Sequence, residues 1–163
     1  MTLFSGQIFD VIQLDTPDGP RQLVTKSSAV AVFAVTTDNQ VVLTNQYRVG
    51  TGNYETELPA GLIDENEDAL IAAQRELAEE TGYTAPDANW VDLGLSFSSS
   101  GFTDEAVHHF LVTGVERTQE QDLDMDENIT IHFMPLNDIA GKIDTAFTSL
   151  STKYGILKAL NNL

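Results

Sequence analysis

The chain lacks cysteine, and its 163 residues include only 8 Lys or Arg side chains against 25 Asp or Glu side chains. The lack of cysteine excludes disulfides and thiolate zinc sites. The net charge of −17 argues against binding nucleic acid or anionic membranes through a general basic field. No apolar run reaches membrane-spanning length, and the first ten residues lack the basic start of a secretion signal. We therefore expect a cytoplasmic protein that binds neither nucleic acid nor membrane.

The length predicts a single domain over residues 1–163, which is large enough to bury a hydrophobic core without the help of disulfide bonds. Residues 6–14 and 22–27 are rich in β-forming side chains and flank TPDGP, which is a strong turn signal. They predict an antiparallel hairpin. We expect residues 1–28 to form this N-terminal hairpin and residues 29–163 to form the main body.

Periodicity and breaker residues divide the main body into strands and helices. Strands are expected over 29–35, 41–45, 90–97, 106–115 and 129–134, and helices over 67–81 and 136–143, with a last helix ending at Leu160. Asn137 or Asp138 is expected near the cap of the second helix, and Ser149 or Ser151 at the cap of the last. The last helix has an apolar stripe that predicts core packing, made of Ile156, Leu157 and Leu160. The acidic segment 116–128 predicts a solvated loop.

The segment GLIDENEDALIAAQRELAEETGY, residues 61–83, predicts the central helix. Asn66 is a good N-cap and Gly82 a natural C-terminal stop, so a helix is expected over 67–81. A buried stripe at helical spacing consists of Leu70, Ala73 and Leu77.

Three glutamates, Glu76, Glu79 and Glu80, crowd the last turns of this helix, where the helix dipole disfavours anions. Glu76 and Glu80 also form a repulsive i,i+4 pair. A hard divalent cation such as Mg²⁺ would offset this repulsion, because it takes oxygen ligands from a few carboxylates, water and substrate phosphate. Arg75 can form a bidentate contact to one of the carboxylates and fix its direction.

The spacing of Gly61, Glu67, Arg75-Glu76-Leu77, Glu79-Glu80 and Gly82-Tyr83 resembles the Nudix box at every defining position. The resemblance implies the Nudix fold, an α/β/α sandwich with a mixed central sheet, here with the N-terminal antiparallel hairpin added. It implies a hydrolase that depends on Mg²⁺, with Mn²⁺ as a substitute. By the same resemblance the metal ligands are the Ala60 carbonyl, Glu76, Glu80 and Glu105, while Glu79 binds a further metal or its waters.

Two further segments, QYR at 46–48 and ELPAG at 57–61, resemble the ADP-ribose pyrophosphatase branch of that family. This implies hydrolysis of ADP-ribose to AMP and ribose 5-phosphate, with Arg48 on the diphosphate or the terminal ribose. An alternative for Arg48 is a surface ion pair with Glu55 or Glu57. Glu57 has two open roles, metal coordination or bracing Arg75. Gly61 allows the backbone to approach a ligand closely.

The loop 98–105, SSSGFTDE, is predicted to carry the general base. Glu105 is the candidate and Asp104 its competitor. ADP-ribose pyrophosphatases commonly have Ser-Pro-Gly in this loop, and Ser100 stands at the proline position here, which weakens the assignment to this branch. An N-terminal sheet in these relatives implies a homodimer.

Three alternative functions stay open. The first is hydrolysis of GDP-mannose or another nucleoside diphosphate sugar, and the second is cleavage of a modified nucleoside triphosphate. The third is a non-catalytic module that senses ADP-ribose. The complete set of acids in the box argues against the third, because a sensor does not need every one of them.

Overall fold

The computed structural model describes residues 1–125 and 127–163. The helices in these ranges are α1 (Ala69–Thr81), α2 (Leu136–Ala146) and α3 (Leu150–Leu160), with a short 3-10 helix, η1 (Asp87–Asn89). The strands are β1 (Thr2–Ser5), β2 (Asp10–Thr16), β3 (Gly19–Thr25), β4 (Ala29–Thr36), β5 (Gln40–Arg48), β6 (Asn53–Glu57), β7 (Ala60–Leu62), β8 (Tyr83–Thr84), β9 (Trp90–Phe97), β10 (Ala106–Arg117) and β11 (Thr130–Pro135). All five strands predicted in the main body are confirmed.

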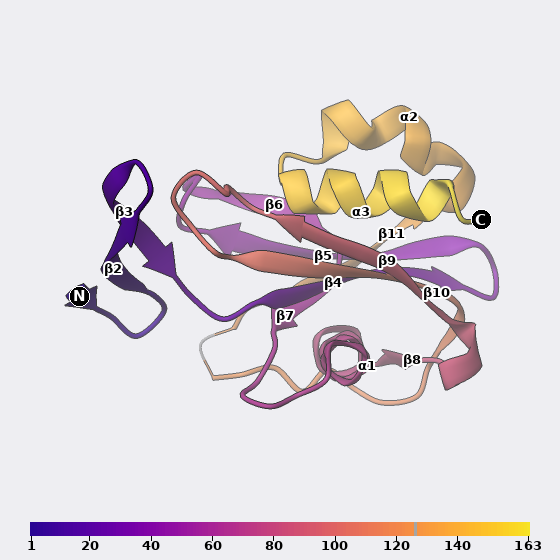
Figure 1. The fold of residues 1–163 in the computed structure, drawn as a ribbon. Helices are drawn as coiled ribbons and strands as arrows, with labels where there is room; N and C mark the ends of the chain where they lie inside the picture. The colour runs from indigo at the N-terminus through magenta and orange to yellow at the C-terminus, as the bar shows by residue number, and fades with distance from the viewer. Residues whose placement is uncertain (126) are drawn as a thin grey trace.

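The main body is an eight-stranded mixed sheet between helices. Its order is β11-β5-β4-β10-β8, and β6, β7 and β9 pair with β5, β4 and β10. The central strands β4 and β10 run parallel, and the other pairs are antiparallel. Helix α1 covers one face, and α2 and α3 cover the other (Figure 1). The predicted α/β/α sandwich is therefore confirmed.

Strand β4 separates two hydrophobic clusters because its successive side chains point to opposite faces. Val30 and Val32 pack in the cluster beneath α1, together with Leu77. Phe33 lies in the cluster beneath α2 and α3, together with Ile156. Burial on both faces explains why this strand is an almost continuous apolar run.

The N-terminal segment forms a three-stranded antiparallel sheet, β1-β2-β3. The predicted hairpin corresponds to β2 and β3, but its strands extend closer to the turn, and Thr16 and Gly19 pair at its end. Gly19 has a φ of 96°, which favours glycine there. Strand β1 was not predicted; it pairs with β2, and the Gln13 N–H donates to the Met1 carbonyl at 2.8 Å.

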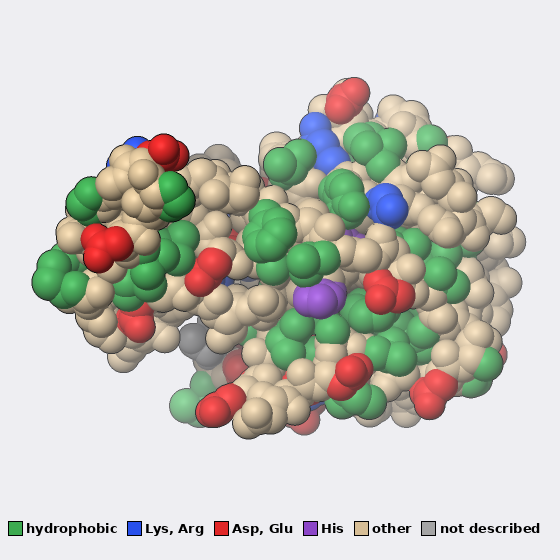
Figure 2. Space-filling model, viewed as in Figure 1, with side chains coloured by type: hydrophobic (Ala, Val, Ile, Leu, Met, Phe, Trp, Pro, Cys, Tyr) green, Lys and Arg blue, Asp and Glu red, His purple; other side chains and the backbone are tan. Residues whose placement is uncertain are grey.

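This N-terminal sheet stands to one side of the main body (Figure 1). One parallel bridge joins Val24 to Thr103 in the loop after β9, and the Val24 N–H donates to the Phe102 carbonyl at 2.8 Å. The N-terminal sheet carries many exposed apolar side chains (Figure 2), namely Met1, Leu3, Phe4, Ile8, Phe9 and Leu14.

Helix α1 starts two residues later than predicted. Asp68 is the N-cap, and its carboxylate accepts the Leu70 N–H at 2.9 Å. The predicted cap, Asn66, is wrong because it adopts a left-handed φ of 66°. Glu67 lies before the helix, where its carboxylate accepts the Asp64 N–H at 3.0 Å. The end is as predicted, with Gly82 in the left-handed conformation at φ 75°.

Helix α2 begins directly after β11. Pro135 is its N-cap and makes no side-chain capping bond, so Asn137 and Asp138 lie near the cap, as predicted, but neither is the cap itself. Both residues lie inside the first turn, because Pro135 ends β11 and its fixed φ suits a helix start.

Helix α3 is capped by Ser149, as predicted, and the Ser149 hydroxyl accepts the Thr152 N–H. Its buried face includes Ile156 and Ala159. Leu157 is 51% exposed, so the predicted apolar stripe is wrong at that position. It lies about 100° around the helix from Ile156 and points away from the sheet.

The acidic segment between β10 and β11 forms a loop in its described residues, and residue 126 lies outside them. Across residues 1–125 and 127–163, no helix combines the length and the apolar character needed to cross a bilayer.

Candidate active site

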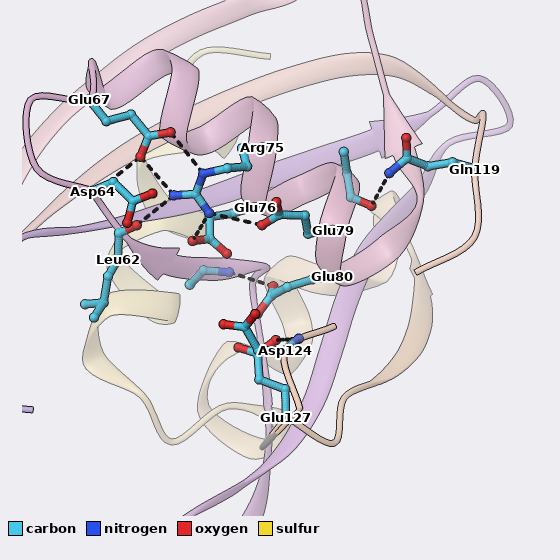
Figure 3. Close-up of polar contacts among 12 residues, drawn as sticks. Leu62, Asp64, Glu67, Arg75, Glu76, Glu79, Glu80, Gln119, Asp124 and Glu127 are labelled. Atoms are coloured by element: carbon cyan, nitrogen blue, oxygen red, sulfur yellow. Dashed lines mark hydrogen bonds and ion pairs between the residues drawn. The ribbon is translucent and has the colours of Figure 1, made fainter. Parts of the chain in front are cut away.

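Arg75, on α1, joins the acidic side chains around it (Figure 3). Its guanidinium contacts both carboxylate oxygens of Glu67 at 2.9 Å, Glu76 at 2.8 Å and Glu79 at 3.0 Å. It also donates to the Leu62 carbonyl at 3.0 Å, which ties α1 to β7. The hydrogen bonds from Arg75 hold the pKa of Glu67 down, to about 2. The predicted orienting role of Arg75 thus has a geometric basis.

Glu76 and Glu80 turn from α1 toward β7. Glu80 is 2% exposed, and its carboxylate accepts the Ala60 N–H at 2.9 Å. Burial is the main cause that raises the pKa of both glutamates. The charges of Glu79 and Glu127 raise the pKa of Glu76 further, and those of Glu76 and Glu127 raise that of Glu80. Two buried carboxylates that repel one another are therefore held beside the strand that carries Ala60 and Gly61.

Gly61 is required by the position of Glu76. A Cβ at residue 61 would lie 2.0 Å from the Glu76 Cδ, which is far inside van der Waals contact. Gly61 pairs with Val30 of β4, so the central sheet fixes its backbone. The sequence predicted a close approach of a ligand at Gly61, and the structure places a carboxylate there.

Arg48 and Glu57 form a pair, with Arg48 Nε 2.6 Å from Glu57 Oε2. The ion pair with Glu57 that was considered for Arg48 is therefore present, although the Glu57 side chain is buried and does not lie on the surface. Glu57 was predicted either to bind the metal or to hold Arg75 in place. The second role is wrong, because the Glu57 carboxylate contacts Arg48. Burial raises the pKa of Glu80, and the positive charge of Arg48 opposes part of this rise, so Arg48 lies near the box acids.

Glu105 and Asp104 face the N-terminal segment. Glu105 forms an ion pair with Lys26 at 2.7 Å. Asp104 accepts from the Thr25 hydroxyl at 2.6 Å and from the Lys26 N–H at 3.3 Å. Burial alone would raise the pKa of Glu105, but hydrogen bonds from Lys26 and Ser98 outweigh it and lower the pKa. Both acids thus connect the loop after β9 to the chain that follows β3.

Glu127 was missed by the sequence analysis, which placed it in a solvated loop. The loop wraps the C-terminal end of α1: Gln121 donates to the Glu80 carbonyl at 2.6 Å, and the Asp122 N–H donates to the Glu79 carbonyl at 2.9 Å. These contacts bring Glu127 toward Glu80 (Figure 3), and its charge raises the pKa of both Glu76 and Glu80. No local pattern in the sequence marks this long-range approach.

The donor set fits a hard divalent cation. Across residues 1–125 and 127–163, no group of three or more His, Asp or Glu side chains forms a complete metal cage. Mg²⁺ does not need one, since it keeps waters and is usually held by one or two carboxylates with substrate phosphate. Glu76 and Glu80 are such a pair: both are buried, and burial together with the charges of neighbouring glutamates raises their pKa values. A cation would relieve both effects.

Known proteins resemble this chain over most of its length. The NUDIX domain family matches residues 25–152. ADP-ribose pyrophosphatase of Bacillus subtilis is 35% identical over 167 aligned positions, which cover 96% of this chain and 89% of that protein. Methanol dehydrogenase activator of Bacillus methanolicus is 34% identical over 143 positions, covering 83% of this chain and 76% of that protein.

A solved structure described as an ADP compounds hydrolase superposes with a TM-score of 0.80 at 22% identity. It covers all of this chain and 90% of its own, so it shows the same fold. The family match spans the box helix, β7 and the loop after β9. The chain therefore belongs to the NUDIX domain family and is a Nudix hydrolase that resembles the ADP-ribose pyrophosphatase branch.

Proposed function

We propose that the protein hydrolyses the pyrophosphate bond of a nucleoside diphosphate sugar, with ADP-ribose as substrate and AMP and ribose 5-phosphate as products. The observation that carries the proposal is the buried, mutually repelling pair Glu76 and Glu80 beside Gly61. Similarity to the Bacillus subtilis ADP-ribose pyrophosphatase supports the choice of substrate. GDP-mannose and other nucleotide sugars, modified nucleoside triphosphates and a sensing role are the competing assignments.

Glu76 and Glu80 would hold Mg²⁺, with Mn²⁺ as a substitute, and the Ala60 carbonyl would complete the protein's share of the ligands. When bound, the metal neutralises the diphosphate and lowers the pKa of a coordinated water. Arg75 keeps Glu76 and Glu79 oriented, and Glu79 binds waters of the site or a further metal. Gly61 keeps the space beside Glu76 clear of a side chain.

Arg48 binds the diphosphate or the terminal ribose, and Glu57 fixes the direction of the Arg48 guanidinium. In the reaction, water attacks one phosphorus, the bridging P–O bond breaks, and the water's proton passes to a carboxylate. Glu105, its competitor Asp104, and Glu127 are the candidates for this base. We favour Glu127, because its charge acts on Glu76 and Glu80, whereas Glu105 is paired with Lys26.

The deciding experiment is a turnover assay on a substrate panel, with and without Mg²⁺ and with identification of the products. ADP-ribose should be cleaved to AMP and ribose 5-phosphate only when a divalent cation is present. Preference for a nucleoside triphosphate would overturn the substrate assignment. Binding of ADP-ribose without turnover, at any metal concentration, would favour the sensing role.

We also propose that the protein works as a homodimer in the cytoplasm, with the N-terminal segment 1–28 at the dimer interface. The exposed Phe4 and Ile8 side chains of that segment, 53% and 71% exposed, support this arrangement. Replacing both by serine should yield a monomer in light scattering coupled to size exclusion. Ile71→Ser, at a 54% exposed position on α1, is the matched control. A monomeric wild-type protein would contradict the dimer.

A further inference from the structure

A cavity of about 350 Å³ lies on the face of the sheet opposite α1, between the end of β9 and the first turn of α3. Four serines line it, Ser96 and Ser98 from the β9 side and Ser149 and Ser151 from the α3 side. Phe97, Leu150 and Tyr154 supply apolar surface. Its volume is at the lower end of the range for small-molecule sites, which begins at roughly 300 Å³.

A buried imidazole holds one wall of this cavity in place. His109 is fully buried, its Nε2 lies 2.8 Å from the Ser96 hydroxyl, and its ring is 4.9 Å from the Tyr154 ring. Burial lowers the pKa of His109 to about 4, so the imidazole is neutral at neutral pH. Ser96 and Tyr154 are therefore positioned by the same side chain.

The tautomer of His109 decides which way the Ser96 proton points. His109 Nδ1 is buried near Gly155 and has no hydrogen-bond partner among the described residues. A buried N–H without an acceptor is rarer than a buried acceptor without a donor, so the proton belongs on Nε2. Ser96 then accepts from His109, and its own hydroxyl proton is available to a ligand in the cavity.

The lining suits a neutral ligand that carries hydroxyl groups. None of the described residues that line the cavity carries a charged side chain, although the chain as a whole carries a net charge of −17. The hydroxyls of Ser96 and of the two α3 serines can each donate one hydrogen bond and accept others, which matches the hydroxyl groups of a sugar. The Ser98 hydroxyl is already engaged by the Glu105 carboxylate. The ring of Tyr154, which packs against His109, offers surface to the C–H face of a sugar ring.

The cavity shares its walls with segments of the candidate active site. Thr148, just before the first turn of α3, donates to the Glu55 carboxylate at 2.6 Å, and the Thr152 hydroxyl accepts the Leu58 N–H at 3.4 Å. Glu55 and Leu58 flank Glu57, which holds Arg48. On the other side, the Ser98 N–H donates to the carbonyl of Glu105 at 3.1 Å.

We propose that this cavity binds a neutral sugar ring through Ser96, the serines of the α3 first turn and the Tyr154 ring. The sugar is either the non-nucleoside end of the substrate, in which case the inference rests on the proposed function, or a free monosaccharide. Both sources would present the same hydroxyl groups to the cavity. They differ in their effect on KM for a nucleotide sugar, which changes only if the sugar is part of the substrate.

The test uses the full chain and two independent variants. Ser96→Val removes the hydroxyl and keeps a residue suited to a strand, while Ser151→Leu fills the cavity from a helical position. Ser100→Ala, in the same loop as Ser98 but outside the lining, is the control. Melting temperatures establish that each variant is folded. Binding of D-ribose and D-glucose is followed by saturation-transfer NMR, and KM and kcat are measured for ADP-ribose and ADP-glucose.

If the substrate supplies the sugar, KM should rise about fivefold for each hydrogen bond lost, with a smaller change in kcat. If a free sugar is the ligand, the NMR signal of the wild type should disappear in both variants while KM is unchanged. Unchanged KM together with an absent or unaltered NMR signal overturns the inference. Failure of the wild type to cleave any nucleotide sugar would instead reject the proposed function, and the NMR measurement would still decide the cavity.

Discussion

The backbone of Gly61 lies directly against the carboxylate of Glu76, so closely that a Cβ at residue 61 would sit 2.0 Å from the Glu76 Cδ. Gly61→Ala must therefore displace Glu76 or bend β7. We expect kcat/KM to fall by about a hundredfold, since a displacement near 1 Å can cost that much. Gly141→Ala is the control, because nothing lies within 4 Å of its Cβ and alanine favours the helix. Equal activity in both variants would contradict the assignment of Glu76 to the reaction.

Glu80→Gln should separate metal binding from folding. Loss of the carboxylate should lower kcat by roughly a thousandfold, because the metal contributes several kcal/mol to such reactions. Folding should survive, since burial disfavours the charge of Glu80 and an amide removes that cost. Added Mg²⁺ should raise the melting temperature of the wild type and leave that of the variant unchanged. A full Mg²⁺ response in Glu80→Gln would show that the metal binds elsewhere.

Glu127→Gln and Glu105→Gln should identify the base. Removing the base should lower kcat by about a hundredfold or more and affect KM much less. We expect this result for Glu127. Glu105→Gln breaks the ion pair to Lys26, so it should act on stability and KM more than on kcat. Asp104→Ala is the matched control on the same loop. A large loss of kcat in Glu105→Gln alone would return the role to Glu105.

Glu67→Gln should change how the melting temperature of the protein depends on pH. The pKa of Glu67 is lowered to about 2 from an ordinary value of 4.5. Its stabilising contribution is therefore complete above pH 4.5 and is lost as the pH falls toward 2. The variant should melt earlier than the wild type at pH 6, and the difference should shrink as the pH falls through this window. A difference that is constant with pH would show that the Glu67–Arg75 contact is not its source.

Arg75→Lys tests the geometry of the contacts that orient the box acids. A lysine keeps the charge but cannot reach Glu67, Glu76 and Glu79 with a planar fork. Each lost charged hydrogen bond is worth about 1.5 to 3 kcal/mol, so kcat/KM should fall by at least about tenfold. Arg117→Lys, at an exposed pair with Glu120, is the control. A wild-type rate in Arg75→Lys would indicate that charge alone is enough.

Local signals in the sequence predicted most of the architecture. The strand run at 29–35, the left-handed Gly82 and the Ser149 cap each depend on nearest neighbours, and each is confirmed. Asn66 failed as a cap because Glu67 is drawn out of the helix by Asp64 and by Arg75, eight residues further along the chain. Strand β1 was not predicted, because it is only four residues long and lies at the edge of its sheet, where all of its side chains are exposed.

The site was predictable where its residues share one helix and not where distant loops meet. The spacing of Glu76 and Glu80 places both carboxylates on one side of α1, as expected. The approach of Glu127 depends on a loop that folds over the end of α1, and the partners of Asp104 lie nearly eighty residues away. Such contacts leave no periodic signal.

The bridge between Val24 and Thr103 has a consequence for any shortened form of the chain. The region matched by the NUDIX family begins at residue 25, so a protein trimmed to that boundary would lose Val24. The segment that carries Phe102 and Asp104 would lose its backbone partner at the same time. Trimming at residue 25 would thus remove two backbone hydrogen bonds that Val24 makes with the loop carrying Asp104 and Glu105.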